Sequence, residues 1–379
     1  MIDRTLFKEE HRLFRDNLKR FLAKEVLPYH AQWEERGYVD REVWRRAGLE
    51  GFLCPTVPEV YGGSGADQLF SVAVIEEIAL AGASGLGWSL HSDVVAPYIL
   101  VYGTEAQRSH YLPGMVSGEI IGAIAMTEPA AGSDLKGILT TAKRDGDEYV
   151  VNGSKTFITN GQHCDLVILA VKTGPLEGVK GISLLLVDAA LTGFSRGKLL
   201  KKSGMRALDT TELFFDEMRV PVSNLLGQEG QGFAMLMQQL PWERLQAAIY
   251  SVAAAETAIS STIDYTRERR AFGRELLAFQ NTRFTLSELK TEVQIGRVFV
   301  DRCVELLLQG KLDATAASMA KYWTTNLGFK VMDACVQLHG GYGYMHDFPI
   351  SRAWADAGIY RLAGGSNEIM KELIGRSLK

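Results

Sequence analysis

The spacing of apolar residues divides the chain into three consecutive parts. From residue 1 to about 119, apolar positions recur every three or four residues, which is the period of an amphipathic helix. Between about 120 and 228 the pattern changes to short β-type runs such as LVILAV and GISLLLV, separated by turn signals at Asn152-Gly153 and Asn160-Gly161. A helical period then returns and continues to Lys379. The pattern predicts a mainly α fold with a central β domain: an N-terminal α-helical domain over 1–119, a mostly antiparallel middle domain over 120–228, and a helical domain over 229–379.

The third part contains the longest predicted helices. They run from Gln231 to about Arg270, from Asn281 to Gln309 and from Asp313 to Leu338. Pro241 falls inside the first of them, where its ring crowds the preceding turn and its missing N–H breaks one backbone hydrogen bond. We therefore expect a kink just before Trp242, Glu243 and Arg244.

Composition and charge narrow the class of protein. The 379 residues include 45 acidic and 41 basic side chains, a formal net charge of -4, so the basic excess of a nucleic-acid-binding protein is missing. The four cysteines are widely spaced and form no C-x-x-C pair, which predicts neither a disulfide framework nor a metal site and favours the cytoplasm. No apolar run approaches the roughly 18 residues of a transmembrane helix, so we expect a soluble protein without stable membrane insertion.

Two segments of the predicted β domain carry candidate binding groups. AMTEPAAGSDL, residues 125–135, is a strand-to-loop segment rich in small residues whose N–H groups could bind a polar ring edge or a phosphate, although a tight turn explains it equally well. VNGSKTFITNG, residues 151–161, resembles a hairpin with Phe157 and Thr159 on one face and Ile158 on the other. Phe157 is either a core aromatic residue or a cover for one face of a flat cofactor.

Three segments of the helical third part are candidates for binding but can also be explained by local helix and loop structure. TRERRAFGRELLAFQ, residues 266–280, clusters arginines at a helix C-terminus, where they either complement the helix dipole or bind a pyrophosphate. QLHGGYGY, residues 337–344, is either a helix C-cap or a close backbone approach to a ligand. GGSNEI, residues 364–369, predicts a loop and a helix capped by Ser366 or Asn367. Glu243, finally, is either an exposed helical glutamate or an acid held in a site.

Taken together and in this order, these segments resemble the acyl-CoA dehydrogenase family, and they are closest in wording to its long-chain members. LPWERL, ATAASMAKYW and GGSNEIMKELIGR contribute to the same resemblance, which covers the whole chain. It implies an N-terminal helical domain, a β-barrel-like middle domain and a C-terminal four-helix bundle.

The resemblance also implies FAD as the cofactor, and it assigns contacts by position. The flavin ring would be surrounded by Met126, Thr127, Ser133, Phe157 and Thr159, and the adenosine half would contact Ser366 and Glu368. A neighbouring subunit would complete the site with Arg269, Phe272, Gln280, Gln337 and Gly341. This sharing implies a homotetramer built as a dimer of dimers.

The implied reaction removes the α-proton of an acyl thioester by a carboxylate while the β-hydrogen leaves as hydride to the flavin. Many family members carry the base in the C-terminal loop, but the matching residue here is Gly364, and the resemblance to long-chain members assigns the base to Glu243. It gives a ribityl hydroxyl of the flavin and the backbone N–H of Gly364 the task of polarising the thioester carbonyl. Ser133, Arg244 and Ala363 are implied to contact substrate, Ala363 standing where a tyrosine is common.

The predicted function is therefore dehydrogenation of a medium- or long-chain fatty acyl-CoA to the trans-2-enoyl thioester, with electrons passed to an electron-transfer flavoprotein. One alternative is a relative that acts on an acyl chain carried by an acyl-carrier protein. A catalytically silent scaffold of the same family, or an oxidase that uses oxygen directly, are two others.

Overall fold

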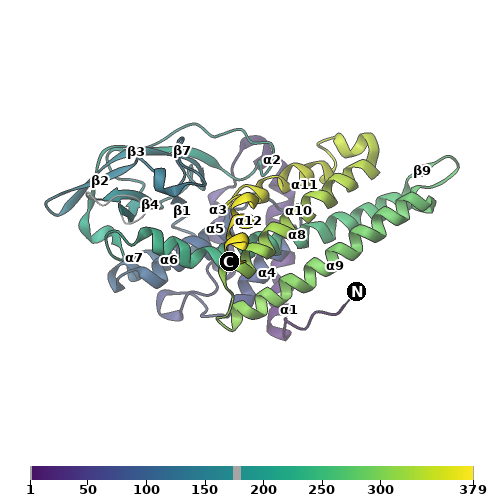
Figure 1. Ribbon diagram of the computed structural model, residues 1–379, viewed down its shortest axis with the longest axis horizontal. Helices are drawn as coiled ribbons and strands as arrows, with labels where there is room; N and C mark the ends of the chain where they lie inside the picture. The colour runs from purple at the N-terminus through teal and green to yellow at the C-terminus, as the bar shows by residue number, and fades with distance from the viewer. Residues whose placement is uncertain (1, 174–180, 379) are drawn as a thin grey trace.

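The structure, a computed structural model, describes residues 2–173 and 181–378 (Figure 1). Helices come first, a sheet follows, and helices complete the chain. The predicted fold class, mainly α with a central sheet, is confirmed.

The N-terminal helices form one packed group. They are α1 (Glu9–Phe21), α2 (Leu27–Arg36), α3 (Arg41–Leu49), α4 (Gln68–Leu80), α5 (Trp88–Leu90), α6 (Ala96–Tyr102) and α7 (Glu105–Ser117), with π-helical turns η1 (Leu22–Val26) and η3 (His91–Val95) between them. Helix α4 is apolar around most of its circumference because it packs against both α1 and α8. Thr104 begins α7 with a capping box, in which its hydroxyl accepts from the Gln107 N–H and the Gln107 side chain accepts from the Thr104 N–H.

The middle part is one mostly antiparallel sheet. Its strands are β1 (Gly122–Ala125), β2 (Thr141–Asp145), β3 (Glu148–Thr159), β4 (Leu166–Thr173), β5 (Ile182–Asp188), β6 (Phe194–Arg196), β7 (Thr210–Pro221) and β8 (Leu225–Leu226). The order is β6-β7-β3-β2-β4-β5-β8, and β1 pairs in parallel with β4. Strands β4 and β5 are apolar at nearly every position because successive side chains enter two different cores. Leu166 and Ile168 face the helices of the N-terminal part, whereas Val167 and Leu169 face the interior of the sheet.

The predicted hairpin at Asn152-Gly153 is wrong. Strand β3 runs unbroken through both residues and pairs with β7 on one side and β2 on the other, with a bulge between Val151 and Gly153. A side chain at Gly153 would meet Thr140 within 2.8 Å, so glycine permits a close backbone approach there rather than a turn. The turn at Asn160, by contrast, is present, with φ +61°.

The C-terminal helices are α8 (Gly232–Glu268), α9 (Gln280–Leu308), α10 (Ala314–His339), α11 (Pro349–Ala357) and α12 (Asn367–Arg376). The first three begin and end within two residues of the predicted bounds. Helix α8 continues through Pro241. A two-strand hairpin, β9 (Arg270–Ala271) and β10 (Arg274–Glu275), joins α8 to α9 and projects from the end of the molecule opposite the sheet (Figure 1).

Candidate active site

Glu243 lies in the first third of α8, next to the helices of the N-terminal part. Its carboxylate is partly buried, and its Oε1 atom accepts a hydrogen bond from the hydroxyl of Tyr98 at 3.1 Å. Tyr98 is fully buried on α6, so the pair joins two helices that lie far apart in sequence. Glu243 is therefore held in a fixed site and is not a solvated helical glutamate.

The electrostatic environment makes Glu243 a weak acid. Burial raises its pKa from 4.5 to about 7, against the opposing effects of the Tyr98 hydroxyl and the positive charge of Arg244. The pKa of Tyr98 is raised beyond its ordinary range by burial and by the adjacent carboxylate, so its hydroxyl stays protonated and remains a donor. A carboxyl group with a pKa near 7 matches the requirement for a general base at neutral pH.

Arg244 is a buried cation with few partners. It is 5% exposed, and its closest hydrogen-bond contact is Nη1 to the Ser318 hydroxyl at 3.5 Å. Within residues 2–173 and 181–378 its Nε atom has no hydrogen-bond partner. Burial lowers the pKa of Arg244, and the charge of Glu243 opposes this shift. Burial, followed by the positive charge of Arg244, lowers the pKa of Lys321 on α10 to about 8.

The C-terminal loop lies against this cluster. Lys321 Nζ donates to the carbonyl of Gly365 at 2.7 Å and to Asn367 Oδ1 at 2.9 Å. Gly364 and Gly365 both have left-handed backbone conformations, with φ +67° and +88°. Ala363 and Gly364 are exposed, and a side chain built at Gly364 would meet nothing within 4 Å. Ser318, which contacts Arg244, and Lys321, which holds the Gly365 carbonyl, are both on α10, so this helix connects α8 with the Gly364 loop.

The two candidate flavin segments of the sheet are tied to each other by a buried ion pair. Lys155 on β3 donates to Glu128 Oε1 at 2.7 Å and to the Met126 carbonyl at 3.1 Å. Burial lowers the pKa of Lys155 to about 8, although Glu128 opposes the shift. The Thr156 N–H donates to the Thr127 carbonyl at 2.9 Å. Met126 and Thr127 are therefore fixed beside the strand that carries Phe157 and Thr159.

Phe157 presents its ring to the outside of the sheet. It is 68% exposed with φ +60°, at an irregularity in the β3–β7 pairing, while Ile158 is buried on the opposite face. An aromatic residue with a left-handed backbone and an exposed ring is rare and is typical of a binding site. Thr159 is partly exposed two residues along the same face, and Ser133 is exposed in the loop after β1.

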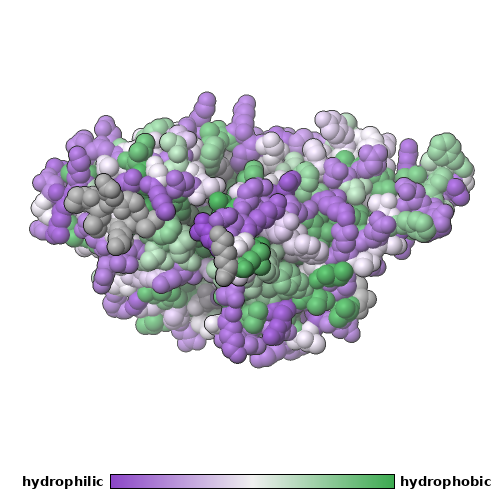
Figure 2. All heavy atoms as spheres, in the orientation of Figure 1, coloured by the Kyte–Doolittle hydropathy of each residue, from purple (hydrophilic) through white to green (hydrophobic). Residues whose placement is uncertain are grey.

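The residues assigned to a neighbouring subunit gather at the far end of the bundle. The Arg269 guanidinium lies 5.8 Å from the ring centroid of Tyr342, so the α8 terminus and the segment of Gln337 and Gly341 are adjacent. Phe272 is 95% exposed at the tip of the β9–β10 hairpin, where Figure 2 shows apolar surface. Arg269, Gln280, Gln337 and Gly341 are exposed as well.

This group is distant from the rest of the site within one chain. Glu243 and Arg269 stand 26 positions apart on and at the end of α8, which corresponds to about 39 Å at 1.5 Å per residue. Figure 1 shows the hairpin at the opposite end of the molecule from the sheet. The structure therefore keeps Arg269 and the residues beside it apart from Glu243 within one chain.

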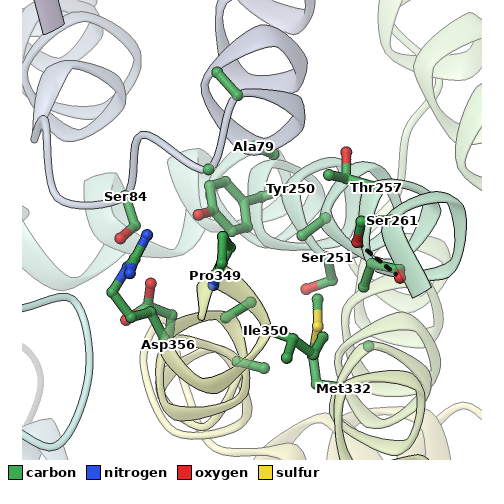
Figure 3. A pocket seen from close by; sticks show the side chains of 18 of the residues that line it. Ala79, Ser84, Tyr250, Ser251, Thr257, Ser261, Met332, Pro349, Ile350 and Asp356 are labelled. Carbon is green, nitrogen blue, oxygen red and sulfur yellow. Dashed lines mark hydrogen bonds between the residues drawn. The ribbon is translucent and has the colours of Figure 1, made fainter. Parts of the chain in front are cut away.

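A cavity of about 240 Å³ lies elsewhere, between α8, α10 and α11 (Figure 3). Tyr250, Met332 and Asp356 line it, and the ring of Tyr250 stacks on Tyr360 at 4.6 Å. None of the predicted site residues lines this cavity. Its wall approaches the Gly364 loop at Tyr360 and at Thr325, which bonds Asn367.

Comparison with known proteins decides the family. Models of the acyl-CoA dehydrogenase N-terminal, middle and C-terminal domains match residues 8–119, 123–218 and 230–379. The chain belongs to the acyl-CoA dehydrogenase family. It is 48% identical to the mitochondrial long-chain specific acyl-CoA dehydrogenase of Rattus norvegicus over 99% of this chain and 88% of that protein. The predicted enzyme class is confirmed.

Solved structures agree with this membership. The crystal structure of an acyl-CoA dehydrogenase from Geobacillus kaustophilus is similar with a TM-score of 0.98 and 48% identity, over all of both chains. An acyl-CoA dehydrogenase from Bacillus anthracis complexed with FAD has a TM-score of 0.94 and 28% identity, over all of this chain and 69% of that one. The family is FAD-dependent, in agreement with the predicted cofactor.

Sequence reasoning missed four residues that the structure places at the site. Tyr98 bonds the candidate base, Lys155 and Glu128 connect the flavin segments, and Lys321 holds the C-terminal loop. Lys155 lies within residues 151–161 and Glu128 within residues 125–135, but a lysine or glutamate in a β segment is ordinarily solvated. No local signal shows that these side chains are buried, because their partners come from other elements.

Among the described residues, no cluster of side chains suited to a metal ion occurs, and no helix is long and apolar enough to cross a membrane.

Proposed function

We propose that this chain oxidises a medium- or long-chain fatty acyl-CoA to the trans-2-enoyl thioester, with Glu243 as the base. The observation that carries the proposal is the position of Glu243: a partly buried carboxylate, bonded to a buried tyrosine, on α8, which packs against the helix α10 that holds the Gly364 loop. Gly364 has no side chain that could serve instead. The 48% identity to a long-chain specific enzyme supports the substrate class.

The exposed groups of the sheet fit a flavin. The ring of Phe157 offers an apolar face, and Thr159 and Thr127 offer polar atoms beside it, on a backbone fixed by the Lys155–Glu128 pair. Ser133 lies in an open loop in which Gly132 leaves space for a ligand. Met126 completes this wall, and Ser366, which caps α12, and Glu368 in its first turn are proposed to contact the adenosine half. When bound, FAD supplies the acceptor for the β-hydrogen.

The residues of the chain would then perform the proton chemistry. Glu243, ionised, takes the α-proton from the face of the Cα–Cβ bond opposite the flavin. The Gly364 N–H donates to the thioester oxygen as negative charge develops there. Among the described residues no backbone carbonyl accepts from this N–H, so it is available. Ala363 leaves room beside the thioester, and Arg244 favours the ionised base.

We propose that two chains complete each cofactor site within a homotetramer. The distance between Glu243 and Arg269 supports this arrangement, as does the exposure of Phe272. Apolar side chains on α9 and α10, among them Ile295, Val298 and Trp323, are also exposed and would be covered by a second copy. Light scattering of the FAD-loaded protein tests the assembly, and a monomer with full FAD content would refute it.

The electron acceptor and the cellular compartment of the enzyme are part of the same proposal. Family membership supports an electron-transfer flavoprotein as the electron acceptor. The four cysteines are buried free thiols, which suits the reducing cytoplasm.

Anaerobic titration tests the reaction directly. Purified FAD-loaded protein is titrated with acyl-CoAs of increasing chain length and with the same acyl groups on an acyl-carrier protein, and bleaching of the flavin is recorded. We expect the acyl-CoAs to reduce the flavin faster. Faster reduction by the carrier-bound acyl groups would replace the proposed substrate, and no bleaching by either would support a silent member of the family.

Glu243→Gln tests the base in the same assay. Glutamine keeps the size of the side chain and cannot accept the proton, so flavin reduction should slow by about 10²–10⁴ while FAD content is unchanged. Glu288→Gln, at an exposed position of α9, is the matched control. Reduction by Glu243→Gln at the rate of this control would refute the assignment.

A further inference from the structure

Lys321 is a buried ammonium group whose hydrogen-bond partners are neutral. Its side chain is 0% exposed, and its acceptors are the carbonyl of Gly365 and the amide oxygen of Asn367. No carboxylate of the described residues lies within 4 Å of it, whereas the other fully buried lysine, Lys155, is paired with Glu128. An ammonium group buried without a counter-ion costs free energy. Because its two short hydrogen bonds go to the C-terminal loop, we relate this cost to holding that loop in place.

The loop itself has few other restraints near Gly364. The Ala363 N–H donates to the Ile359 carbonyl at 2.9 Å, which ends the preceding turn. Gly364 and Gly365 follow with left-handed backbone, a conformation that glycine leaves as readily as it adopts. Nothing packs where a side chain of Gly364 would stand. The next fixed point along the chain is the Gly365 carbonyl, which Lys321 holds.

The anchor continues into α12 and α10. Asn367, 3% exposed, accepts from Lys321 and donates to Thr325 Oγ1 at 3.0 Å and to Asn326 Oδ1 at 3.1 Å. Thr325 and Lys321 are one turn apart on α10, so both bind the end of the loop that leads into α12. The loop is thereby attached to α10, which packs against α8, the helix that carries Glu243.

We propose that Lys321 is a positioning residue that fixes the Gly364–Gly365 backbone, so that the Gly364 N–H points at the thioester oxygen while Glu243 faces the α-carbon. The inference rests on the proposed function, because it names what aligns the two groups of that reaction. Lys321 touches neither substrate nor reacting atoms. Its removal should loosen the N–H donor and leave the base and the flavin wall in place.

Lys321→Met separates this role from a merely structural one. Methionine has a similar length and fills the same apolar space without a donor. We expect FAD content close to that of the unaltered protein, kcat at least about tenfold lower and KM changed much less, because a preorganised oxyanion donor contributes about 10²–10³ in kcat and a displaced one keeps part of that. Lys330→Met, an exposed lysine on the same helix, is the matched control.

Enolate formation by a bound substrate analogue is a measurement that a general loss of protein stability would not change. Acetoacetyl-CoA forms an enolate that absorbs light and transfers no hydride, so its bound enolate fraction reports stabilisation of the oxygen alone. Lys321→Met should bind this probe with a smaller enolate fraction at each pH than the unaltered protein. An unchanged enolate fraction together with unchanged kcat would overturn the proposal.

Two further variants keep the test decisive. If Lys321→Met does not fold, Lys321→Gln, which is shorter and uncharged but keeps an amide donor group, and Asn367→Ala, which leaves the Gly365 bond, are measured instead. The glutamine variant should lose more enolate than the alanine variant, and equal, unaltered fractions in both would refute the role of Lys321. If no acyl-CoA reduces the flavin of the unaltered protein, the proposed function fails, whereas the enolate fraction, which needs no hydride transfer, still tests the role of Lys321.

Discussion

Removal of the Tyr98 hydroxyl should shift the pH at which the enzyme becomes active. The hydroxyl donates to Glu243 Oε1 at 3.1 Å and thereby stabilises the ionised base. Tyr98→Phe deletes this bond and leaves the ring, so the pKa of Glu243 should rise further. The sign follows from the donor: a hydrogen bond made to the carboxylate lowers its pKa, and its loss raises it.

The size of the shift can be worked from the structure. A hydrogen bond to a charged group contributes about 1.5–3 kcal/mol, and one pKa unit corresponds to about 1.4 kcal/mol. The pKa of Glu243 should therefore move from about 7 to roughly 8–9. At a pH below both pKa values, the ionised fraction of Glu243 in Tyr98→Phe, and with it the rate, should be about tenfold or more lower than in the unaltered protein. Above about pH 9 the rates of the two proteins should converge.

The assay is stopped-flow reduction of the flavin by saturating acyl-CoA, without oxygen, across this pH range. Tyr102→Phe is a matched control, because Tyr102 ends the same helix and its hydroxyl bonds Gln238 at 2.8 Å instead of the base. We expect Tyr102→Phe to keep the unaltered midpoint. A midpoint for Tyr98→Phe that is unchanged, or that moves to lower pH, would show that the hydroxyl does not act on the base.

Three other variants test the remaining assignments. Glu243→Gln combined with Gly364→Glu should recover part of the activity lost by Glu243→Gln, because the loop has room for a side chain. The backbone angle φ of +67° at Gly364 limits the recovery, since a residue with a Cβ atom is strained there. A rate no higher than that of the single variant would contradict position 364 as a second position for the base. Arg269→Ala should weaken FAD retention in dialysis with little change in melting temperature, since the side chain is exposed in a single chain, whereas Arg267→Ala should not; equal retention would refute a shared site. Ala363→Tyr should block turnover or shift the preferred acyl chain while FAD stays bound, and an identical substrate profile would show that the position does not face the thioester.

Periodicity predicted the elements well where one face of each element decides its pattern. The bounds of α8, α9 and α10 follow from the helical spacing of their apolar residues. The Asn152-Gly153 prediction failed because the same dipeptide suits a turn or a bulge. The pairing of β3 with the long strand β7, which local sequence does not reveal, supplies the hydrogen bonds that keep β3 extended.

The identity of the candidate base was predictable only in part. A glutamate on a helix is ordinarily exposed, and the resemblance of the motifs, not local physics, singled out Glu243. The site residues remain predictions, but the structure adds the reason for one of them: the buried hydroxyl of Tyr98, 145 positions away in sequence, lies against the carboxylate.

The sequence by itself determined the order of helices and strands and the family, because periodicity and motifs are properties of short segments. The tertiary structure alone decided which charged side chains are buried and what they hold. Lys155, Lys321 and Arg244 look like ordinary surface cations in the sequence, yet each is buried. Burial depends on elements distant along the chain that cover a residue, and the free energy of a buried charge is set by those partners.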